Sequence, residues 1–147
     1  MKTIYLAGLI SSDYPESLEW RSEASYILRV HFNVLDPLRG KGDLKEASPD
    51  GGLNHPRLTA ADIILRDYND VAKSDLILVH LDDFGSPRPL IGTIVELGWA
   101  WLMKKPVVAI AKESNQLMRT HPFVVQCVAH YFQTLSQAVT FCIAEYR

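Results

Sequence analysis

The chain has 147 residues, 48% of them hydrophobic, which fits a single globular domain over residues 1–147 with a sizeable core. Its formal net charge of −2, with no local cluster of lysine and arginine, gives no electrostatic case for binding a nucleic-acid polymer. No apolar run reaches the roughly 18 residues of a membrane span and no signal peptide is recognisable, so we expect a cytoplasmic protein without a membrane partner. Cys127 and Cys142 lie in apolar surroundings without zinc-ligand spacing, which indicates buried thiols in a reducing compartment.

Short apolar runs alternate with helix-like patterns from the first residues onward. Residues 3–7 form an apolar run closed by Gly8, which is typical of a buried parallel strand. A helix is expected over about 15–30, where the apolar residues have helical spacing, with Ser12 or Asp13 as its cap. The chain therefore begins with a strand followed by a helix.

The same alternation continues to the end of the chain. A strand at 32–35 precedes a loop over 38–57 that is rich in Gly, Pro, Asp and Lys. A helix over 58–73 is expected to begin at a Thr59 cap. The later elements are expected as a strand at 76–81, a helix from about 92 to 104, a strand at 106–110, a strand near 131–132 and a helix over 136–145.

This order predicts an α/β fold: a single-domain, doubly wound, mostly parallel five-stranded sheet flanked by helices, as in flavodoxin-like or Rossmann-like proteins. Ligands of such folds bind beyond the carboxyl ends of the strands. That rule selects the segments after the strands, at residues 8–13, 36–41, 82–93 and 111–122.

Glu96 is the most unusual residue of the chain, because it stands within an apolar helix-like run. An unpaired ionised carboxylate in such surroundings is costly, so the position needs a reason. Thr93 could cap this helix, and Thr93 and Glu96 have the Thr-x-x-Glu spacing of a capping box. A first-turn carboxylate that faces a cleft would instead suit a nucleophile or a general base. Both interpretations stay open, although a helix that starts at the ligand-binding edge favours the second.

Asp67 is a second candidate, within the helix expected over 58–73. If Ala60, Ile63, Ile64 and Val71 face the core, helical spacing turns Asp67 the same way. An inward aspartate beside an inward glutamate is a candidate acid–base pair. The alternative is an ion pair with Arg66 or Lys73 on a solvated face, and Asp70 is expected to be such a surface group.

Common cofactor and metal signatures are missing from the sequence. It has no Gly-x-Gly-x-x-Gly after the first strand, no Walker-type Gly-Lys-Ser/Thr and no Gly-x-Ser-x-Gly. The five histidines have neither i, i+4 pairing nor a cysteine companion, so we expect no metal site and no cofactor. Met118 and Phe123 could line a pocket for a base, with loop packing as the equal alternative.

Several segments together resemble the nucleoside 2-deoxyribosyltransferase family. They are Lys2-Thr3-Ile4-Tyr5-Leu6-Ala7-Gly8, Arg66-Asp67, Ser74-Asp75-Leu76-Ile77-Leu78-Val79 and Gly92-Thr93-x-x-Glu96-Leu97-Gly98-x-Ala100. The loop Asp36-Pro37-Leu38-Arg39-Gly40-Lys41 is similar to a branch of that family found in bacteria and phages.

The resemblance implies three catalytic roles. Glu96 would be the nucleophile that attacks C1′ of a 2′-deoxynucleoside and forms a covalent deoxyribosyl ester. Asp67 would handle the proton of the leaving base, and Tyr5 would orient the nucleophile. The sugar would pass to another nucleobase, without a cofactor. The implied partners are small molecules, namely a deoxynucleoside or deoxynucleotide and a free base, together with further copies of the chain in a homo-oligomer with shared active sites.

The substrate-binding residues expected on the same grounds follow the strands and open the Glu96 helix. They are Gly8, Asp36, Arg39, Asp82, Gly92, Thr93, Asn115 and Met118. The resemblance implies that Asn115 would contact the 5′-hydroxyl, donated by a neighbouring subunit. One position departs from the family pattern: Leu90 stands where many members carry a base-contacting aspartate, so base recognition must differ, through Asp82, Asp83 or backbone groups.

Two other functions stay open at this stage. A related branch of the family hydrolyses nucleoside 5′-monophosphates, and Arg39, Lys41 and Arg88 could hold a phosphate by charge-assisted hydrogen bonds. The chain could also be a non-catalytic nucleotide-binding module.

Overall fold

The computed structural model describes residues 1–39 and 58–147; most of the predicted 38–57 loop, including Lys41, lies outside the described residues. A five-stranded sheet runs through the described chain in the order β2-β1-β3-β4-β5, and every neighbouring pair is parallel. The strands are β1 (Thr3–Gly8), β2 (Asn33–Leu35), β3 (Leu76–His80), β4 (Val107–Ile110) and β5 (His130–Phe132). The predicted α/β fold class is confirmed, and the sheet is wholly rather than mostly parallel.

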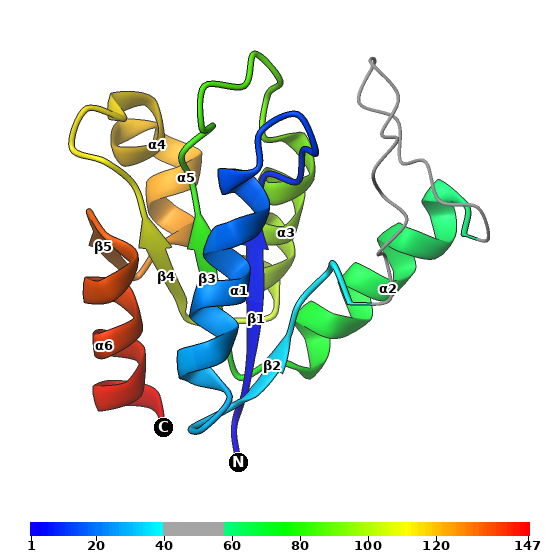
Figure 1. Ribbon diagram of the computed structural model, residues 1–147, viewed down its shortest axis with the longest axis vertical. Helices are drawn as coiled ribbons and strands as arrows, with labels where there is room; N and C mark the ends of the chain where they lie inside the picture. The colour runs from blue at the N-terminus through cyan, green and yellow to red at the C-terminus, as the bar shows by residue number, and fades with distance from the viewer. Residues whose placement is uncertain (40–57) are drawn as a thin grey trace.

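Helices cover both faces of this sheet (Figure 1). They are α1 (Glu16–Leu28), α2 (Ala60–Lys73), α3 (Ile91–Leu102), α4 (Gln116–Thr120), α5 (Pro122–Cys127) and α6 (Leu135–Tyr146). Helices α1 and α6 pack on one face, and α2, α3 and α5 pack on the other. The two short helices α4 and α5 were not predicted, because five or six residues are too few to show a helical period.

The core divides into two layers because successive strand residues point to opposite faces. Ile4 and Leu6 of β1 contribute to the layer under α1 and α6, whereas Tyr5 and Ala7 contribute to the layer under α2, α3 and α5. Tyr5 is thus a polar residue within an otherwise apolar layer, and its side chain is fully buried. None of the helices within residues 1–39 and 58–147 combines the length and the apolar content needed to cross a bilayer.

The predicted helix starts are right for α2 and wrong for α1 and α3. Thr59 caps α2 as expected, in a capping box with Asp62. Helix α1 instead begins after Pro15 without a side-chain cap, so neither Ser12 nor Asp13 serves. The backbone around Tyr14 is already turned towards the helix by hydrogen bonds, which leaves no capping role for an earlier side chain.

Helix α3 begins three residues earlier than a Thr93 cap requires. Its N-cap is Leu90, which is buried and accepts the first helical hydrogen bond, from the Ile94 backbone N–H, at 3.0 Å. Thr93 is therefore a buried residue inside the first turn, and Glu96 lies in the second turn rather than the first. The capping-box interpretation of Glu96 is wrong, and so is the expected first-turn placement near the helix dipole.

The inward face of α2 differs in part from the predicted one. Ile63 and Val71 are buried as expected, but Ala60 and Ile64 are exposed. The inward stripe is formed instead by positions 63, 70 and 71, which are buried, and 66 and 67, which are half-buried, at the i, i+3, i+4 spacing of one helix face. Asp67 is on that stripe, so its predicted orientation holds although the apolar residues used to predict it were partly wrong.

Loss of the α2 cap tests this account of the helix start. Replacing Thr59 with alanine removes the hydroxyl oxygen that accepts from the Asp62 backbone N–H at 3.2 Å. We expect the free energy of unfolding, measured by urea denaturation, to fall by about 1 kcal/mol. Thr140→Ala, at an exposed position inside α6, is the matched control and should change it by less than about 0.5 kcal/mol. Equal effects of the two substitutions would contradict a capping role for Thr59.

Candidate active site

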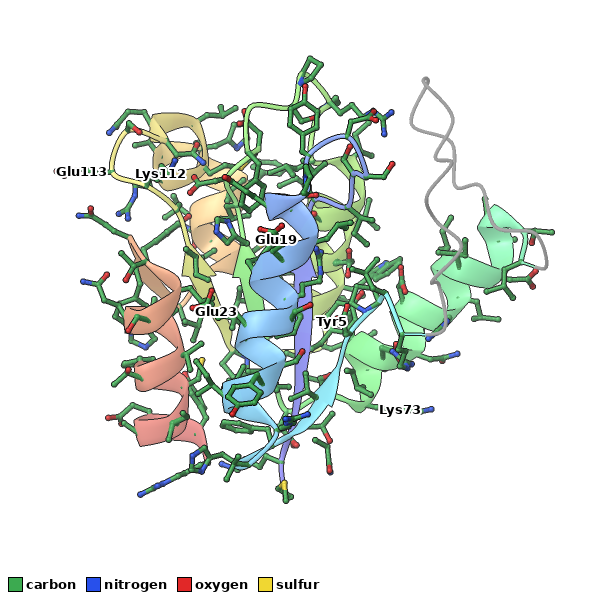
Figure 2. The ribbon with its side chains drawn as sticks, viewed as in Figure 1. Tyr5, Glu19, Glu23, Lys73, Lys112 and Glu113 are labelled. Atoms are coloured by element: carbon green, nitrogen blue, oxygen red, sulfur yellow. The ribbon has the colours of Figure 1, made fainter. Side chains whose placement is uncertain are left out.

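Tyr5, Asp67 and Glu96 come from three elements and meet on one face of the sheet. Tyr5 lies on β1 (Figure 2), Asp67 on the inward stripe of α2, and Glu96 on the second turn of α3. Burial raises the pKa of Tyr5 well above its usual range, and the charges of Glu96 and Asp67 raise it further. The Glu96 carboxylate contributes both as a charge and as a hydrogen-bond acceptor. The tyrosine hydroxyl therefore stays protonated and can donate to Glu96.

The two carboxylates are partly withdrawn from water. Asp67 and Glu96 are half-buried residues, and one oxygen of each, Oδ1 of Asp67 and Oε2 of Glu96, is shielded from solvent. Helices α2 and α3 pack against each other. The rings of Tyr68 on α2 and Trp99 on α3 stand edge to face, with 5.4 Å between their centroids. Low solvent exposure strengthens every electrostatic interaction within the group, so small differences in surroundings can give the two carboxylates different roles.

Arg21 is a buried charge that the sequence analysis missed. Its side chain is fully buried, and its guanidinium donates to the backbone oxygens of Gly8 at 2.6 Å, Leu9 at 3.0 Å and Ser17 at 2.6 Å. It acts electrostatically on Glu96, Tyr5 and Asp67, and it is therefore part of the same site. One signal was available: with helical spacing, Arg21 shares its face with Ala24 and Leu28, both of which are buried.

Gly8 and Asp36 lie around this guanidinium, at the carboxyl ends of β1 and β2. A Cβ on Gly8 would lie 3.0 Å from the His80 carbonyl oxygen and 3.1 Å from the Trp20 ring, so a glycine is needed there. A carboxylate oxygen of Asp36 lies 3.8 Å from Nε of Arg21 and also accepts from the Leu38 backbone N–H at 2.8 Å. Both residues thus shape the site, and direct substrate contact by either remains a prediction.

Arg39 is paired within the protein. Its guanidinium holds both carboxylate oxygens of Asp70, with 2.7 Å between Nη2 and Oδ1. The expectation that Asp70 is a surface group is wrong: it is 3% exposed, because the inward stripe of α2 includes it. Arg66 donates to the Arg39 backbone oxygen and so supports the same corner.

Asp82 and Asn115 tie together the loops after β3 and β4. The Asn115 amide donates to Asp82 at 2.8 Å and to the Leu81 backbone oxygen at 3.1 Å, and its own oxygen accepts from the Met118 backbone N–H. Both Asp82 oxygens accept from the backbone N–H of Lys112, which follows β4 (Figure 2). These hydrogen bonds give Asp82 and Asn115 a structural role at the expected edge, whereas their substrate contacts remain predictions.

The other expected positions are spread around the start of α3 and the later loops. Gly92 is exposed, and nothing lies within 4 Å of a Cβ built on it. Met118 packs against the apolar layer that contains Tyr5. Phe123 is 82% exposed, which places it on the surface of α5. Nowhere in residues 1–39 and 58–147 do three His, Cys, Asp or Glu side chains gather closely enough to hold a metal ion.

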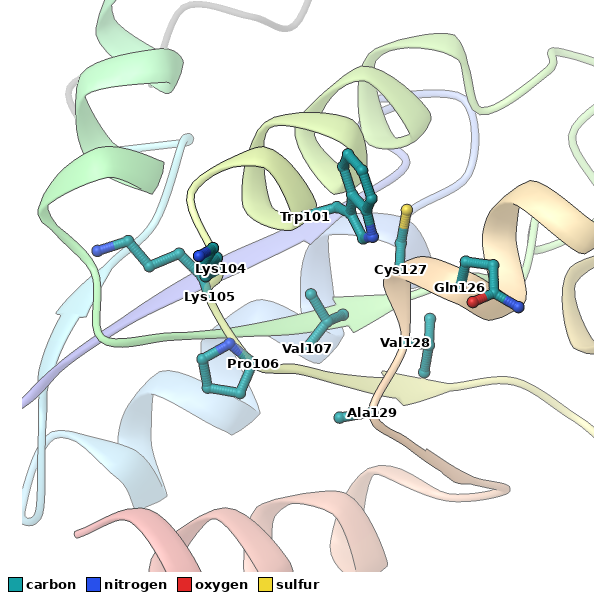
Figure 3. Close-up of a pocket in the computed structure, with 9 residues that line it drawn as sticks. All are labelled: Trp101, Lys104, Lys105, Pro106, Val107, Gln126, Cys127, Val128 and Ala129. Carbon is teal, nitrogen blue, oxygen red and sulfur yellow. The ribbon is translucent and has the colours of Figure 1, made fainter.

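A cavity of about 390 Å³ lies at the other end of the sheet (Figure 3). It is lined by Trp101 and residues 104–107, at the start of β4, on one side, and by the end of α5 and the two residues that follow it on the other. Because Pro106 and Val107 are at the amino-terminal end of β4, this cavity is separate from the edge at which the strands end.

A buried tyrosine on a parallel sheet, together with two half-buried carboxylates on the helices that cover it, forms an acidic site suited to nucleophilic or acid–base chemistry. Residues 4–138 match the family model described as nucleoside 2-deoxyribosyltransferase. The protein belongs to that family, as the sequence motifs predicted.

Solved structures share the fold. The 2-deoxyribosyltransferase from Leishmania mexicana has a TM-score of 0.69 at 15% identity, with 100% of both chains covered. The 2-deoxyribosyltransferase from Bacillus psychrosaccharolyticus has a TM-score of 0.67 at 18% identity, covering 97% of this chain and 93% of that one. A CMP N-glycosidase from Clostridium botulinum has a TM-score of 0.61 at 16% identity, covering 95% and 97%. A search of curated protein sequences finds no match.

His80, at the carboxyl end of β3, makes the stability of this region depend on pH. Its Nδ1 accepts from the Asp82 backbone N–H at 3.3 Å, and its ring packs against Trp20 and Phe84. Burial lowers the pKa of His80 to about 4. On acidification the unfolded chain therefore protonates His80 before the folded protein does, because the pKa of an ordinary histidine is about 6.5.

The contribution of His80 to the free energy of unfolding should be fully present above about pH 6.5. It should decrease by about 3 kcal/mol as the pH drops towards 4. His80→Asn keeps an acceptor at the same place and should flatten that part of the profile of unfolding free energy against pH. His130→Gln, which removes an exposed imidazole, is the control and should leave the slope as it is. An unchanged slope in His80→Asn would contradict the account.

Proposed function

We propose that the protein is a nucleoside 2-deoxyribosyltransferase that moves 2-deoxyribose from one nucleobase to another. The observation that carries the proposal is the convergence of Tyr5, Asp67 and Glu96, from three separate elements, on one partly dehydrated site. Membership of the family supports the same reaction. The substrates are small molecules, a deoxynucleoside and a free base.

The reaction has two balanced halves. In the first, a Glu96 oxygen attacks C1′ while the N-glycosidic bond breaks; the base leaves with the bonding electrons and takes a proton from the Asp67 carboxyl group. In the second, an acceptor nitrogen attacks C1′, the ester bond returns its electrons to Glu96, and the acceptor's proton passes to Asp67. The transition states resemble an oxocarbenium ion, which an anion next to C1′ stabilises.

Tyr5 has the remaining task of holding the nucleophile in place. A hydroxyl that remains protonated at all working pH values donates to one Glu96 oxygen and leaves the other to attack. Since the tyrosine is on a central strand and fully buried, its position is fixed by the sheet. This restricts the carboxylate to a narrow range of orientations, as an efficient nucleophile requires.

Hydrolysis is the second candidate, because water can replace the acceptor base in the second half. The similarity to the structure of a CMP N-glycosidase supports hydrolysis as a candidate. The pairing of Arg39 with Asp70 speaks against a nucleotide substrate, since a phosphate would have to compete with a nearly buried carboxylate for that guanidinium. A nucleoside substrate needs no such exchange, which is why a nucleoside is preferred to a nucleotide as the substrate.

Removing the nucleophile is the direct kinetic test. Glu96→Gln keeps the size of the side chain but cannot form the ester in the same way, and we expect turnover of a deoxynucleoside to fall about 10³-fold or more. Glu23→Gln, on the exposed face of α1 (Figure 2), is the matched control and should leave turnover unchanged. Full turnover in Glu96→Gln would remove Glu96 from the mechanism.

The product formed in the presence of a free acceptor base distinguishes transfer from hydrolysis. With a deoxynucleoside and a different free base, transfer gives a new nucleoside, detected by liquid chromatography. Free deoxyribose with no new nucleoside would overturn transfer and leave hydrolysis. Ligand binding without any turnover would leave the non-catalytic module.

We also propose that the chain forms a homo-oligomer through α3. One face of this helix is apolar and exposed over its whole length, at Ile91, Ile94, Val95, Trp101 and Leu102. Gly98 lies in the middle of this face with open space above it, which would let another helix approach closely. An exposed apolar stripe of this kind is typical of an interface.

A charge in the stripe tests this. Trp101→Glu should shift the protein to a smaller assembly in sedimentation-velocity experiments, because a carboxylate cannot be buried there without a partner. Tyr26→Glu, at a 69% exposed site on α1, is the control and should leave the assembly unchanged. A monomeric wild-type protein at micromolar concentration would contradict the proposal.

A further inference from the structure

We propose, on the basis of the function above, that Arg39 and Asp70 form a positioning pair that holds Asp67 where it can protonate the leaving base. Arg39 lies in the turn that follows β2. Asp70 lies on α2, three residues after Asp67 and on the same face of the helix. The pair therefore joins the helix that carries Asp67 to the sheet.

Apolar packing holds α2 to the sheet on either side of Asp67 but not at Asp67 itself. Ile63 and Val71 are the buried apolar residues of this helix, and more than two helical turns separate them. Between them the inward stripe is polar, at positions 66, 67 and 70. The Tyr68 ring ties this stretch to α3 rather than to the sheet. Attachment of the stretch to the sheet therefore depends on polar contacts.

Two such contacts join the stretch to the turn after β2, and they lie on either side of Asp67. The Arg39 guanidinium holds both carboxylate oxygens of Asp70, with 2.7 Å between Nη2 and Oδ1 and 2.5 Å between Nη1 and Oδ2. Arg66, the residue before Asp67, donates from Nη2 to the Arg39 backbone oxygen at 2.5 Å. Arg39 thus contacts α2 once through its side chain and once through its backbone.

The turn that carries Arg39 is itself fixed to the sheet. The backbone N–H and Nη1 of Arg39 both donate to the Asp36 carbonyl oxygen, at 3.0 Å and 3.1 Å. Asp36 directly follows β2, in which Leu35 is the register partner of Tyr5 on β1. The contacts therefore run from the strands that hold Tyr5, through one turn, to both sides of Asp67. They set Asp67 relative to Tyr5.

The chemistry of the pair suits a positioning role. Asp70 is 3% exposed, and a carboxylate buried to this extent is costly unless it is paired. Two hydrogen bonds from one planar guanidinium fix direction as well as distance, which the single ammonium of a lysine does not. Proton transfer requires the donor to lie within hydrogen-bond reach of the leaving base, so a small displacement of Asp67 slows it steeply. The pair thus acts on the reaction through Asp67.

A leaving group that needs no proton separates positioning from a general structural role. The base of 7-methyl-2′-deoxyguanosine is already cationic, so it leaves as neutral 7-methylguanine when it takes the electrons of the N-glycosidic bond. The base of 2′-deoxyguanosine needs the proton of Asp67. In single-turnover experiments, Asp70→Asn should slow base release from 2′-deoxyguanosine about tenfold and from the 7-methylated substrate by less than about twofold. Equal slowing of the two substrates, or no slowing of either, would overturn the proposal.

Arg66→Met tests the second contact and does not depend on the Asp70 variant folding, because it leaves the buried ion pair intact. It should also slow 2′-deoxyguanosine more than the 7-methylated substrate, and if Asp70→Asn fails to fold, equal slowing here overturns the proposal alone. Arg39→Lys keeps the charge but not the paired hydrogen bonds, and its rates should fall between those of wild type and Asp70→Asn. Asn69→Ala, at an exposed position on the same turn of α2, is the control and should leave both rates unchanged.

Hydrogen exchange keeps this test apart from that of the proposed function, because it needs no turnover. Backbone amides 66–71 of α2 should exchange about tenfold faster in Asp70→Asn than in wild type, and those of α6 should exchange as in wild type. This result would support the attachment of α2 even in a protein that cleaves neither nucleoside, a failure that counts against the proposed function alone. Unchanged exchange of the α2 amides in Asp70→Asn and Arg66→Met would overturn the positioning role while leaving Glu96-dependent turnover intact.

Discussion

The placement of a carboxylate against a buried tyrosine hydroxyl is the constraint on which the rest of the site depends. Tyr5 occupies a core position on a central strand, where a polar atom is expensive unless it has a partner. Glu96, on α3, raises the pKa of this hydroxyl both as a charge and as an acceptor, and it brings a negative charge into a region with little water. The buried guanidinium of Arg21 also acts electrostatically on both residues.

The fold brings these groups together because all five strands are parallel. The connection from β2 to β3 carries α2 across the β1 face, and the connection from β3 to β4 places α3 beside it. Asp67 and Glu96 therefore reach Tyr5 from adjacent helices. On the other side of the strand ends, α1 delivers Arg21, while Asp82 and Asn115 hold the later loops in place. The site needs each of these connections, although its members are distant in sequence.

The strands and the meeting of the catalytic candidates could be predicted from the sequence. Apolar runs identify buried parallel strands, and the carboxyl-edge rule then selects the segments around Gly8, Asp36 and Asp82. Interactions that depend on distant partners could not be predicted. The Arg39–Asp70 pair joins residues 31 apart, and helical spacing indicates an inward Arg21 without showing that its guanidinium donates to the backbone oxygens of Gly8 and Leu9. The start of α3 was misplaced for a similar reason, since burial of Leu90, a tertiary effect, outweighed the local capping signal of Thr93. The roles of the substrate-binding candidates rest on the family resemblance, and no local pattern tests them.

The central claim is that Glu96 becomes covalently attached to the sugar. Mass spectrometry of the intact protein, mixed with a 2′-deoxynucleoside and quenched in acid, tests it most directly. The account predicts a species heavier than the free chain by one deoxyribosyl unit, with the added mass on the peptide that contains Glu96, and no such species in Glu96→Gln. An adduct on another residue would contradict it. So would turnover of the nucleoside during which the protein keeps its unmodified mass at every time point, including the first milliseconds.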